Sequence, residues 1–302
     1  MSAFETSSGS SFRGPANQEK RAIMKISTTI TAPSKTLLSA WERALLVLPA
    51  LAGLVLGLFP LLLPKLFADV AQFPSDDPYV YQLAGAATLG YGVALSIGLF
   101  QKHWLAVRLP VIGVLVFNLA SLYACGIEIF KGHAPYSVYV VLATSLLFVA
   151  ISSLFLARHS GVPRPEQELA SGLVRLFLIV GAVSAATFGL LPLFVPDIFT
   201  FFHLHINAPF VVRQAGAASL GYAVLAVLAQ RALNGRELRL IGVMAAVFNG
   251  VSGVVSIPYI LAGNILLLPW IIGPFGLLVM VGCVLLLRQT MAQTARGTDG
   301  II

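Results

Sequence analysis

The chain has 302 residues, of which 58% are hydrophobic and 10% are charged. Soluble domains carry about 25% charged residues, and a chain this apolar has too little polar surface to cover itself in water, which excludes an ordinary soluble domain. The formal charge of +7 would suggest nucleic-acid binding in a soluble protein, but its distribution follows membrane orientation, and no nucleic-acid partner is expected.

The first segment, residues 1–37, is rich in Ser, Thr and scattered charge and has no sustained apolar period. This composition is typical of a flexible tail. Its basic residues would favour contact with anionic lipid headgroups.

Eight apolar segments follow, each close to the ~20 residues that cross a bilayer. We predict spans at 42–64, 80–101, 106–128, 137–158, 173–195, 210–230, 238–262 and 265–288. The lipid bilayer is therefore the first expected partner of this chain.

The distribution of positive charge predicts the orientation of these spans. With the N-terminus in the cytoplasm, sixteen of the nineteen Lys and Arg residues fall on the inner side, and only Lys65, Lys131 and Arg213 fall outside. By the positive-inside rule, the chain is predicted to be an integral protein of a bacterial inner membrane or a plasma membrane, with both termini cytoplasmic.

The sequence repeats itself. Residues 57–67 return at 189–199 with six of eleven positions identical, and residues 78–92 return at 209–223 with nine of fifteen identical. The offset is 132 residues in the first pair and 131 in the second. Because each repeat has four spans, both enter the membrane from the same side, which predicts a pseudo-twofold axis along the membrane normal.

The predicted fold class is thus an all-α membrane protein of eight transmembrane helices. Its four-helix repeats are expected at 38–158 and 173–288, joined by a cytoplasmic linker at 159–172 and followed by a tail at 289–302. Pro78 and Pro209 suit the first turn of their helices, and Asp77 is a suitable N-cap.

Asn118 and Asn249 are the leading candidates for a polar site. Each lies ten residues after an inner-face arginine, about 15 Å deep and near the middle of the bilayer. Ser121 and Ser252 follow one turn later on the same faces. These residues favour either a small-molecule pocket between the repeats or hydrogen bonds that stabilise the bundle.

The second helix of each repeat carries small residues at 86 and 90 and at 217 and 221, a spacing that lets helix backbones approach closely. Tyr91 and Tyr222 follow and would place a hydroxyl inside the bundle. Packing and ligand binding are both open for them.

Arg213 differs from Gln82 at the equivalent position of the first repeat. It would lie just below the outer surface, where it could bind an anionic headgroup, a carboxylate or a phosphate. The alternative is an arginine whose charged end extends to the interface.

His203 and His205, with Asp197 and His133, could supply ligands for zinc. Their spacing matches no metal motif, and solvated loop histidines are the alternative. No other feature indicates a cofactor: no span has paired histidines for haem, and the chain contains no phosphate-binding loop, nucleophile elbow or zinc-protease motif.

Each half resembles the DoxX-like family of four-helix membrane proteins. The likeness rests on a first helix that ends at Pro60 or Pro192 and a second that opens with residues 213–217, where Gln82 departs from the arginine. The resemblance implies architecture and no particular activity.

Four functions remain open from the sequence, one of which is a subunit that packs its helices against partners in a larger complex. The other three are as follows. The first is a non-enzymatic accessory protein or binder of a small apolar or amphipathic ligand, since reactive groups are few. The second is a small-molecule transporter with a site at the repeat interface. The third is a membrane enzyme acting on a lipid or quinone at the outer face.

Overall fold

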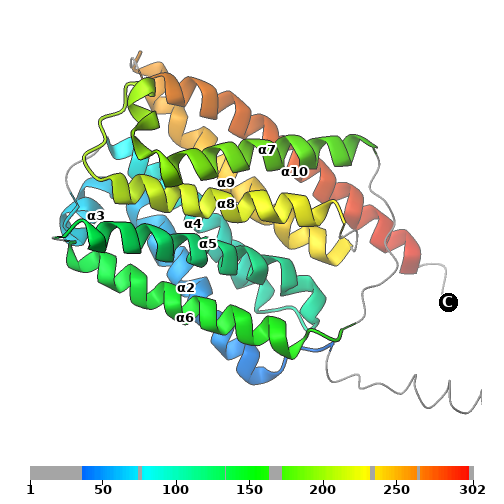
Figure 1. Cartoon of the computed structure of the whole chain (residues 1–302). Coiled ribbons are helices and arrows are strands. Elements are labelled where there is room, and N and C mark those ends of the chain that lie inside the picture. Colours follow the sequence, from blue (N-terminus) through cyan, green and yellow to red (C-terminus); the bar gives the residue numbers. More distant parts are fainter. Residues whose placement is uncertain are drawn as a thin grey trace, which may run out of the picture. The chain divides into compact units, whose positions relative to one another are not determined.

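The computed structural model of the chain describes residues 36–73, 77–132, 134–162, 172–231, 235–263 and 266–298 (Figure 1). Residues 1–35 of the predicted tail, residues 163–171 of the predicted linker and His133 lie outside the described residues.

The described part of the chain contains eight helices that are long and apolar enough to cross a membrane. This confirms the prediction of an all-α protein with eight candidate spans. They are α2 (Ala40–Leu62), α4 (Pro78–Gly98), α5 (Trp104–Phe130), α6 (Tyr136–Arg158), α7 (Gly172–Phe194), α8 (Pro209–Ala229), α9 (Gly235–Leu261) and α10 (Leu267–Thr298). Helix α10 continues past Arg288 into the segment where the sequence predicts a tail.

Local sequence explains where several helices begin. Ser39 caps α2 in a reciprocal capping box with Glu42, so two otherwise unpaired backbone N–H groups are satisfied. Asp77 caps α4 by accepting a hydrogen bond from the backbone N–H of Tyr79, and Pro78 occupies the first turn. Pro209 opens α8 in the same way.

Two short helices separate the first and second long helices of each half. Helix α3 (Pro64–Ala71) follows α2, and the 3-10 helix η2 (Pro196–Phe202) follows α7. Both begin at a proline, which suits a first helical turn and ends the preceding helix. The sequence predicts these breaks but not the short helices behind them.

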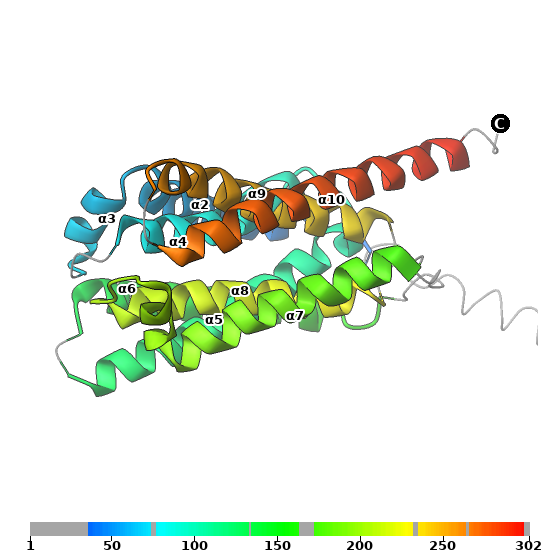
Figure 2. The same cartoon turned by 90° about the horizontal axis from the view of Figure 1, so that it is seen from above.

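The eight long helices lie in two layers (Figure 2). One layer holds α2, α4, α9 and α10, and the other holds α6, α5, α8 and α7. Helix α4 packs more extensively on α9 than on α5, and α8 packs more extensively on α5 than on α9. The two predicted four-helix units are therefore interleaved and do not stand as separate bundles. The internal repeat and its twofold axis stay a prediction.

Small residues explain how neighbours within a layer approach so closely. A Cβ atom added to Gly53 of α2 would lie 2.7 Å from the Cα atom of Gly92 of α4. In lipid, such backbone approach and the dispersion contacts it allows hold helices together. The same close approach joins α7 to α8, where Gly189 faces the backbone of Leu220.

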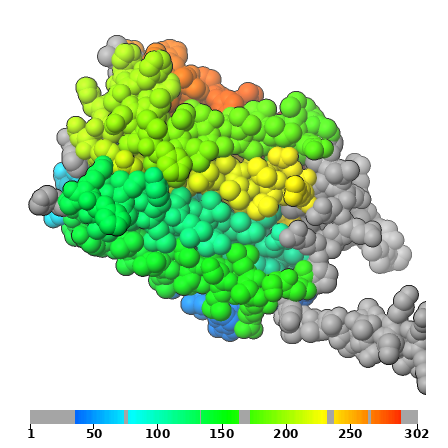
Figure 3. Space-filling model, viewed as in Figure 1, coloured from blue at the N-terminus to red at the C-terminus, as the bar shows by residue number. Residues whose placement is uncertain are grey.

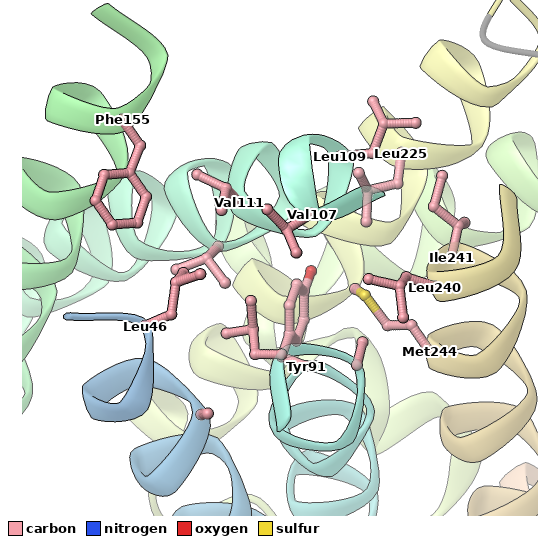
Figure 4. Packing of buried hydrophobic residues seen from close by; sticks show 14 of the residues in the cluster. Leu46, Tyr91, Val107, Leu109, Val111, Phe155, Leu225, Leu240, Ile241 and Met244 are labelled. Atoms are coloured by element: carbon pink, nitrogen blue, oxygen red, sulfur yellow. The ribbon is translucent and has the colours of Figure 1, made fainter. Parts of the chain in front are cut away.

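The largest buried cluster occupies the centre of both layers and includes Leu46 of α2, Tyr91 of α4 and Leu225 of α8 (Figure 4). Trp104 and Phe155 extend it toward α6. This cluster contains residues from both halves of the chain, which from residue 36 onward form one compact unit.

Candidate functional site

An elongated cavity of about 730 Å³ lies among α7, α8, α9 and α10, with α4 contributing Val80, Leu83 and Ala87 to its wall. Its volume falls within the ~300–1,000 Å³ that is typical of small-molecule sites. We refer to this cavity as the slot.

The slot runs along most of the length of the helices that line it. On α7 its lining extends from Val174 to Phe188, about 21 Å at 1.5 Å per helical residue. On α10 the lining extends from Leu268 to Leu287. A chain-like molecule could therefore lie along it, roughly parallel to the helices.

The slot opens sideways between α7 and α10, which form the same edge of the two layers in Figure 2. Leu278, Val281 and Leu285 of α10 line it and are 69%, 50% and 53% exposed. Val180 of α7 also lines it and is 46% exposed. Figure 3 shows this edge from the side of α7, with the orange first part of α10 behind it. These exposed rim residues are all apolar, which is typical of a helix surface that contacts lipid rather than water.

Few polar groups line the slot, and none of its described lining residues is charged. The Nδ2 atom of Asn249 donates to the carbonyl of Ala245 in its own helix, 2.9 Å away. The Oδ1 atom of Asn249 accepts no hydrogen bond from the described residues. Ser252 is 2% exposed, and its Oγ atom has no partner in the described part of the chain. The remaining lining side chains that can form hydrogen bonds are Ser184, Ser219, Tyr222 and Cys283, whose thiol is a weak donor.

The unpaired hydroxyl of Ser252 has a cause in the sequence. At the position 131 residues earlier, Ser121 donates to the Oε1 atom of Gln214 at 2.7 Å. The position equivalent to Gln214 is Leu83, which cannot accept a hydrogen bond and lines the slot. A buried hydroxyl without a partner costs about 1–3 kcal/mol, so a bound polar group would relieve that cost.

The space itself also follows from residue sizes. Helix α6 presents bulky side chains where α10, 131 residues later, has smaller ones. Val279 stands at the position equivalent to Phe148, Gly282 at that of Ile151, and Leu286 at that of Phe155. All three of the smaller residues line the slot. The corresponding crevice among α2, α4, α5 and α6 has no room for a water molecule.

A cluster of polar and aromatic side chains closes the first half at its predicted inner end. The fully buried Glu42 lies 2.9 Å from the Nε2 atom of His159 and 3.1 Å from the Nε atom of Arg158. Trp104 stacks on His159 with ring centroids 4.5 Å apart, and Arg158 lies over Trp41. This inner clamp holds the start of α2 against the end of α6.

The second half lacks the residues of the inner clamp. Val174 stands at the position equivalent to Glu42, and Thr290 stands at the position equivalent to His159. Val174 instead lines the inner end of the slot. The second half therefore lacks both the bulky side chains and the inner clamp that close the crevice in the first half.

The structure divides the polar residues predicted from the sequence into two groups. Tyr222, Asn249 and Ser252 line the slot. Asn118 does not: it is 6% exposed and donates to the carbonyl of Val114 in its own helix. Ser121 and Tyr91 are buried outside the slot as well, so the candidates that line the slot all come from the second repeat, while α4 of the first repeat supplies part of the opposite wall.

Arg213 lies away from the slot, buried where α8 packs against α5. Its Nη1 atom is 3.7 Å from the Oε2 atom of Glu128, and its Nε atom has no hydrogen-bond partner in the described residues. Lys131 lies 3.6 Å from the same carboxylate oxygen. The arginine therefore belongs to a charged group at the predicted outer end of the bundle.

The candidate zinc ligands do not come together in the described part of the chain. No group of three metal-binding side chains occurs there. His203 ends η2 in a left-handed conformation with φ of 63°, and His205 follows in the loop. His133 lies outside the described residues.

Most residues of the slot are apolar and could not be selected from a single sequence as binding residues. Gly181, Val279 and Gly282 are examples. A comparison of side-chain sizes between the two halves contains the relevant difference, since the second half has less bulk on its last helix.

The chain was compared with known proteins, and no family model, curated protein or solved structure matches it.

Proposed function

We propose that this protein is a non-enzymatic membrane protein that binds a small apolar or amphipathic molecule in the slot. The observation that carries the proposal is the 730 Å³ volume behind an apolar, lipid-facing opening. The lining supplies dispersion contacts and a few hydrogen-bonding groups, and its described residues include no acid, base or thiolate-activating cation that would indicate catalysis.

The apolar lining favours a ligand that reaches the slot from the bilayer. Burial of apolar groups supplies little driving force when the surroundings are lipid. Shape fit and the hydrogen-bonding groups of the slot must therefore select this ligand over bilayer lipid. Such binding suits an accessory protein that holds or presents a membrane-soluble compound.

Native mass spectrometry of the protein released from mild detergent tests this proposal. We expect a discrete bound molecule, and we expect its loss in Gly181→Phe. A Cβ atom at Gly181 meets nothing within 4 Å, so the ring can occupy the slot without a backbone clash. Gly126→Phe is the matched control, because Gly126 is also open but lies on α5 outside the slot. Equal adducts in both variants would refute the proposal.

Transport is the second candidate, and the length of the slot favours it. A lining of about 21 Å covers most of a ~30 Å hydrocarbon core, which is the geometry of a path along the bundle. Purified protein in liposomes should then accelerate the exchange of the bound compound between leaflets. If exchange is no faster than in protein-free liposomes, transport is refuted and ligand binding remains as the proposed function.

An enzyme acting on a lipid or quinone at the outer face has less support. It requires His133, His203 and Arg213 in one cleft. Arg213 and His203 do not line the slot, and Arg213 already has Glu128 beside it.

We also propose that the protein lies in a bacterial inner membrane or a plasma membrane with cytoplasmic termini, as the charge bias favours. Duplication of a DoxX-like four-helix unit would explain the matched sequences of the two halves. Cysteine labelling of residues 159–172 from the cytoplasmic side only would support this orientation.

A further inference from the structure

We infer that the slot selects an uncharged amphiphile, meaning an apolar chain or ring that bears a hydroxyl or carbonyl group, and that this group binds at Asn249 and Ser252. The inference rests on the proposed function, since it names the class of molecule that the slot would hold.

Asn249 and Ser252 together offer a ligand one hydrogen-bond acceptor and one group that can also donate. Asn249 and Ser252 are three residues apart on α9, so their side chains share a face of the helix, and both line the slot. Ser252 Oγ can donate or accept, and it has no partner among the described residues. Asn249 Oδ1 accepts. A ligand hydroxyl could donate to one and accept from the other, and a ligand carbonyl could accept from Ser252.

Asn249 and Ser252 also lie at a depth that the headgroups of bilayer lipids do not reach. Asn249 lies ten residues after Arg239, about 15 Å along the helix and near the middle of the hydrocarbon core. A bilayer phospholipid keeps its headgroup at the interface, so its polar end would not reach this pair. The ligand is therefore distinguished from bulk lipid by a polar group that lies deep in the membrane.

The lining also disfavours ligands with an ionised group. No described lining residue carries a charge. A carboxylate, phosphate or ammonium group placed at this depth would lose its hydration without a counter-ion. An uncharged hydroxyl or carbonyl loses far less and gains the two available hydrogen-bonding positions. The slot is thus selective against ionised lipids with the same apolar chain.

Photolabelling of the purified full-length protein tests the inference. Three probes share one diazirine-bearing sixteen-carbon chain and end as an alcohol (hexadecanol), a carboxylate (hexadecanoate) or an alkane (hexadecane). The carboxylate probe is used well above the usual pKa of its acid, so that it is ionised. Labelled peptides from α7 and α10 are quantified by mass spectrometry, and competition titrations give half-saturation concentrations.

We expect the alcohol to label α7 and α10 at the lowest concentration and the carboxylate to label them least. Ser252→Ala should raise the half-saturation concentration of the alcohol about three- to tenfold, the range expected for one hydrogen bond. It should leave that of the alkane unchanged. Ser121→Ala is the matched control, since Ser121 is the equivalent serine and does not line the slot, and it should change neither.

Two results would overturn the inference and leave the proposed function intact. One is equal labelling by the alcohol and the alkane with no effect of Ser252→Ala. The other is a carboxylate that labels as well as the alcohol does. A different result would overturn the proposed function itself: no probe labels α7 or α10, or Gly181→Phe labels as the unmodified protein does.

Discussion

Tyr91 of α4 and Tyr222 of α8 cross between the two layers and bind each other's helix. The hydroxyl of Tyr91 donates to the carbonyl of Ala218 at 2.8 Å, and the hydroxyl of Tyr222 donates to the carbonyl of Ala87 at 2.9 Å. The two rings lie 4.9 Å apart. These reciprocal contacts join the layers at the centre of the protein, which is what two matching halves in a symmetric arrangement would produce.

Replacement of Gly221 tests this crossing. A Cβ atom at Gly221 would overlap the hydroxyl of Tyr91 and lie 2.9 Å from the carbonyl oxygen of Gly113. We expect Gly221→Ala to lower the free energy of unfolding in detergent micelles by about 1–3 kcal/mol, the usual cost of overpacking. Gly126→Ala, where a Cβ atom meets nothing within 4 Å, should be neutral or stabilising by up to about 1 kcal/mol, since Ala favours a helix more than Gly does. Equal stability of the two variants would show that Tyr91 moves aside without cost.

The inner clamp gives a second prediction for stability. Glu42 accepts hydrogen bonds from Ser39 and has His159 and Arg158 as ionisable partners. Glu42→Ala removes the buried carboxylate that Ser39, Arg158 and His159 share, so we expect a loss of about 3 kcal/mol in the free energy of unfolding. Unfolding titrations followed by circular dichroism would measure it.

Val174→Ala is the control for that experiment, because Val174 stands at the equivalent position and lines the open slot. We expect it to cost less than about 1 kcal/mol, as is usual for a residue with freedom to relax. A cost for Val174→Ala as large as that for Glu42→Ala would mean that the second half is as tightly closed as the first.

Transfer of first-half bulk into the slot gives a third prediction. The double variant Val279→Phe and Leu286→Phe places on α10 the residues that α6 has at Phe148 and Phe155. We expect bound small molecules to disappear from native mass spectra. Stability without ligand should rise by about 1 kcal/mol, since filled cavities are generally favourable. Retained ligand with full occupancy would place binding elsewhere.

Hydropathy and charge were enough to predict the eight spans, because length and apolar content alone decide which helices cross a bilayer. The interleaving of the halves could not be predicted in this way. In lipid every face of a helix is apolar, so the choice of partner depends on fine packing such as that between Gly53 and Gly92.

The candidate site was predictable only in part. Asn249 and Ser252 are visible as polar residues at mid-depth, but Asn118 and Ser121 look the same in the sequence. What separates the two pairs is Gln214, which accepts a hydrogen bond from Ser121, whereas the equivalent position on α4 is Leu83, which lines the slot. This contrast depends on which helices pack together. Likewise, the smaller side chains around the slot predict a cavity only once it is known which helices face one another.

The two halves of the chain have different residues at one pair of equivalent positions. At one end of α8, Arg213 lies 3.7 Å from Glu128 of α5. At the equivalent positions, Gln82 of α4 accepts a hydrogen bond from Tyr259 of α9 at 3.0 Å. An ion pair in one half thus stands where a neutral hydrogen bond stands in the other.

Replacing both residues of the Arg213–Glu128 pair together should cost less than the sum of the two single replacements. Arg213→Gln alone leaves the carboxylate of Glu128 largely buried beside Lys131 only, and we expect a loss of about 1–3 kcal/mol. Glu128→Tyr alone strands the buried guanidinium and should cost as much or more. The double variant reproduces the neutral pair of the other half, so its cost should be smaller than the sum of the single costs by about 1 kcal/mol or more. A double-mutant cycle of unfolding free energies in micelles measures this coupling. Additive costs would mean that the two side chains do not interact, and that Arg213 is held by groups other than Glu128.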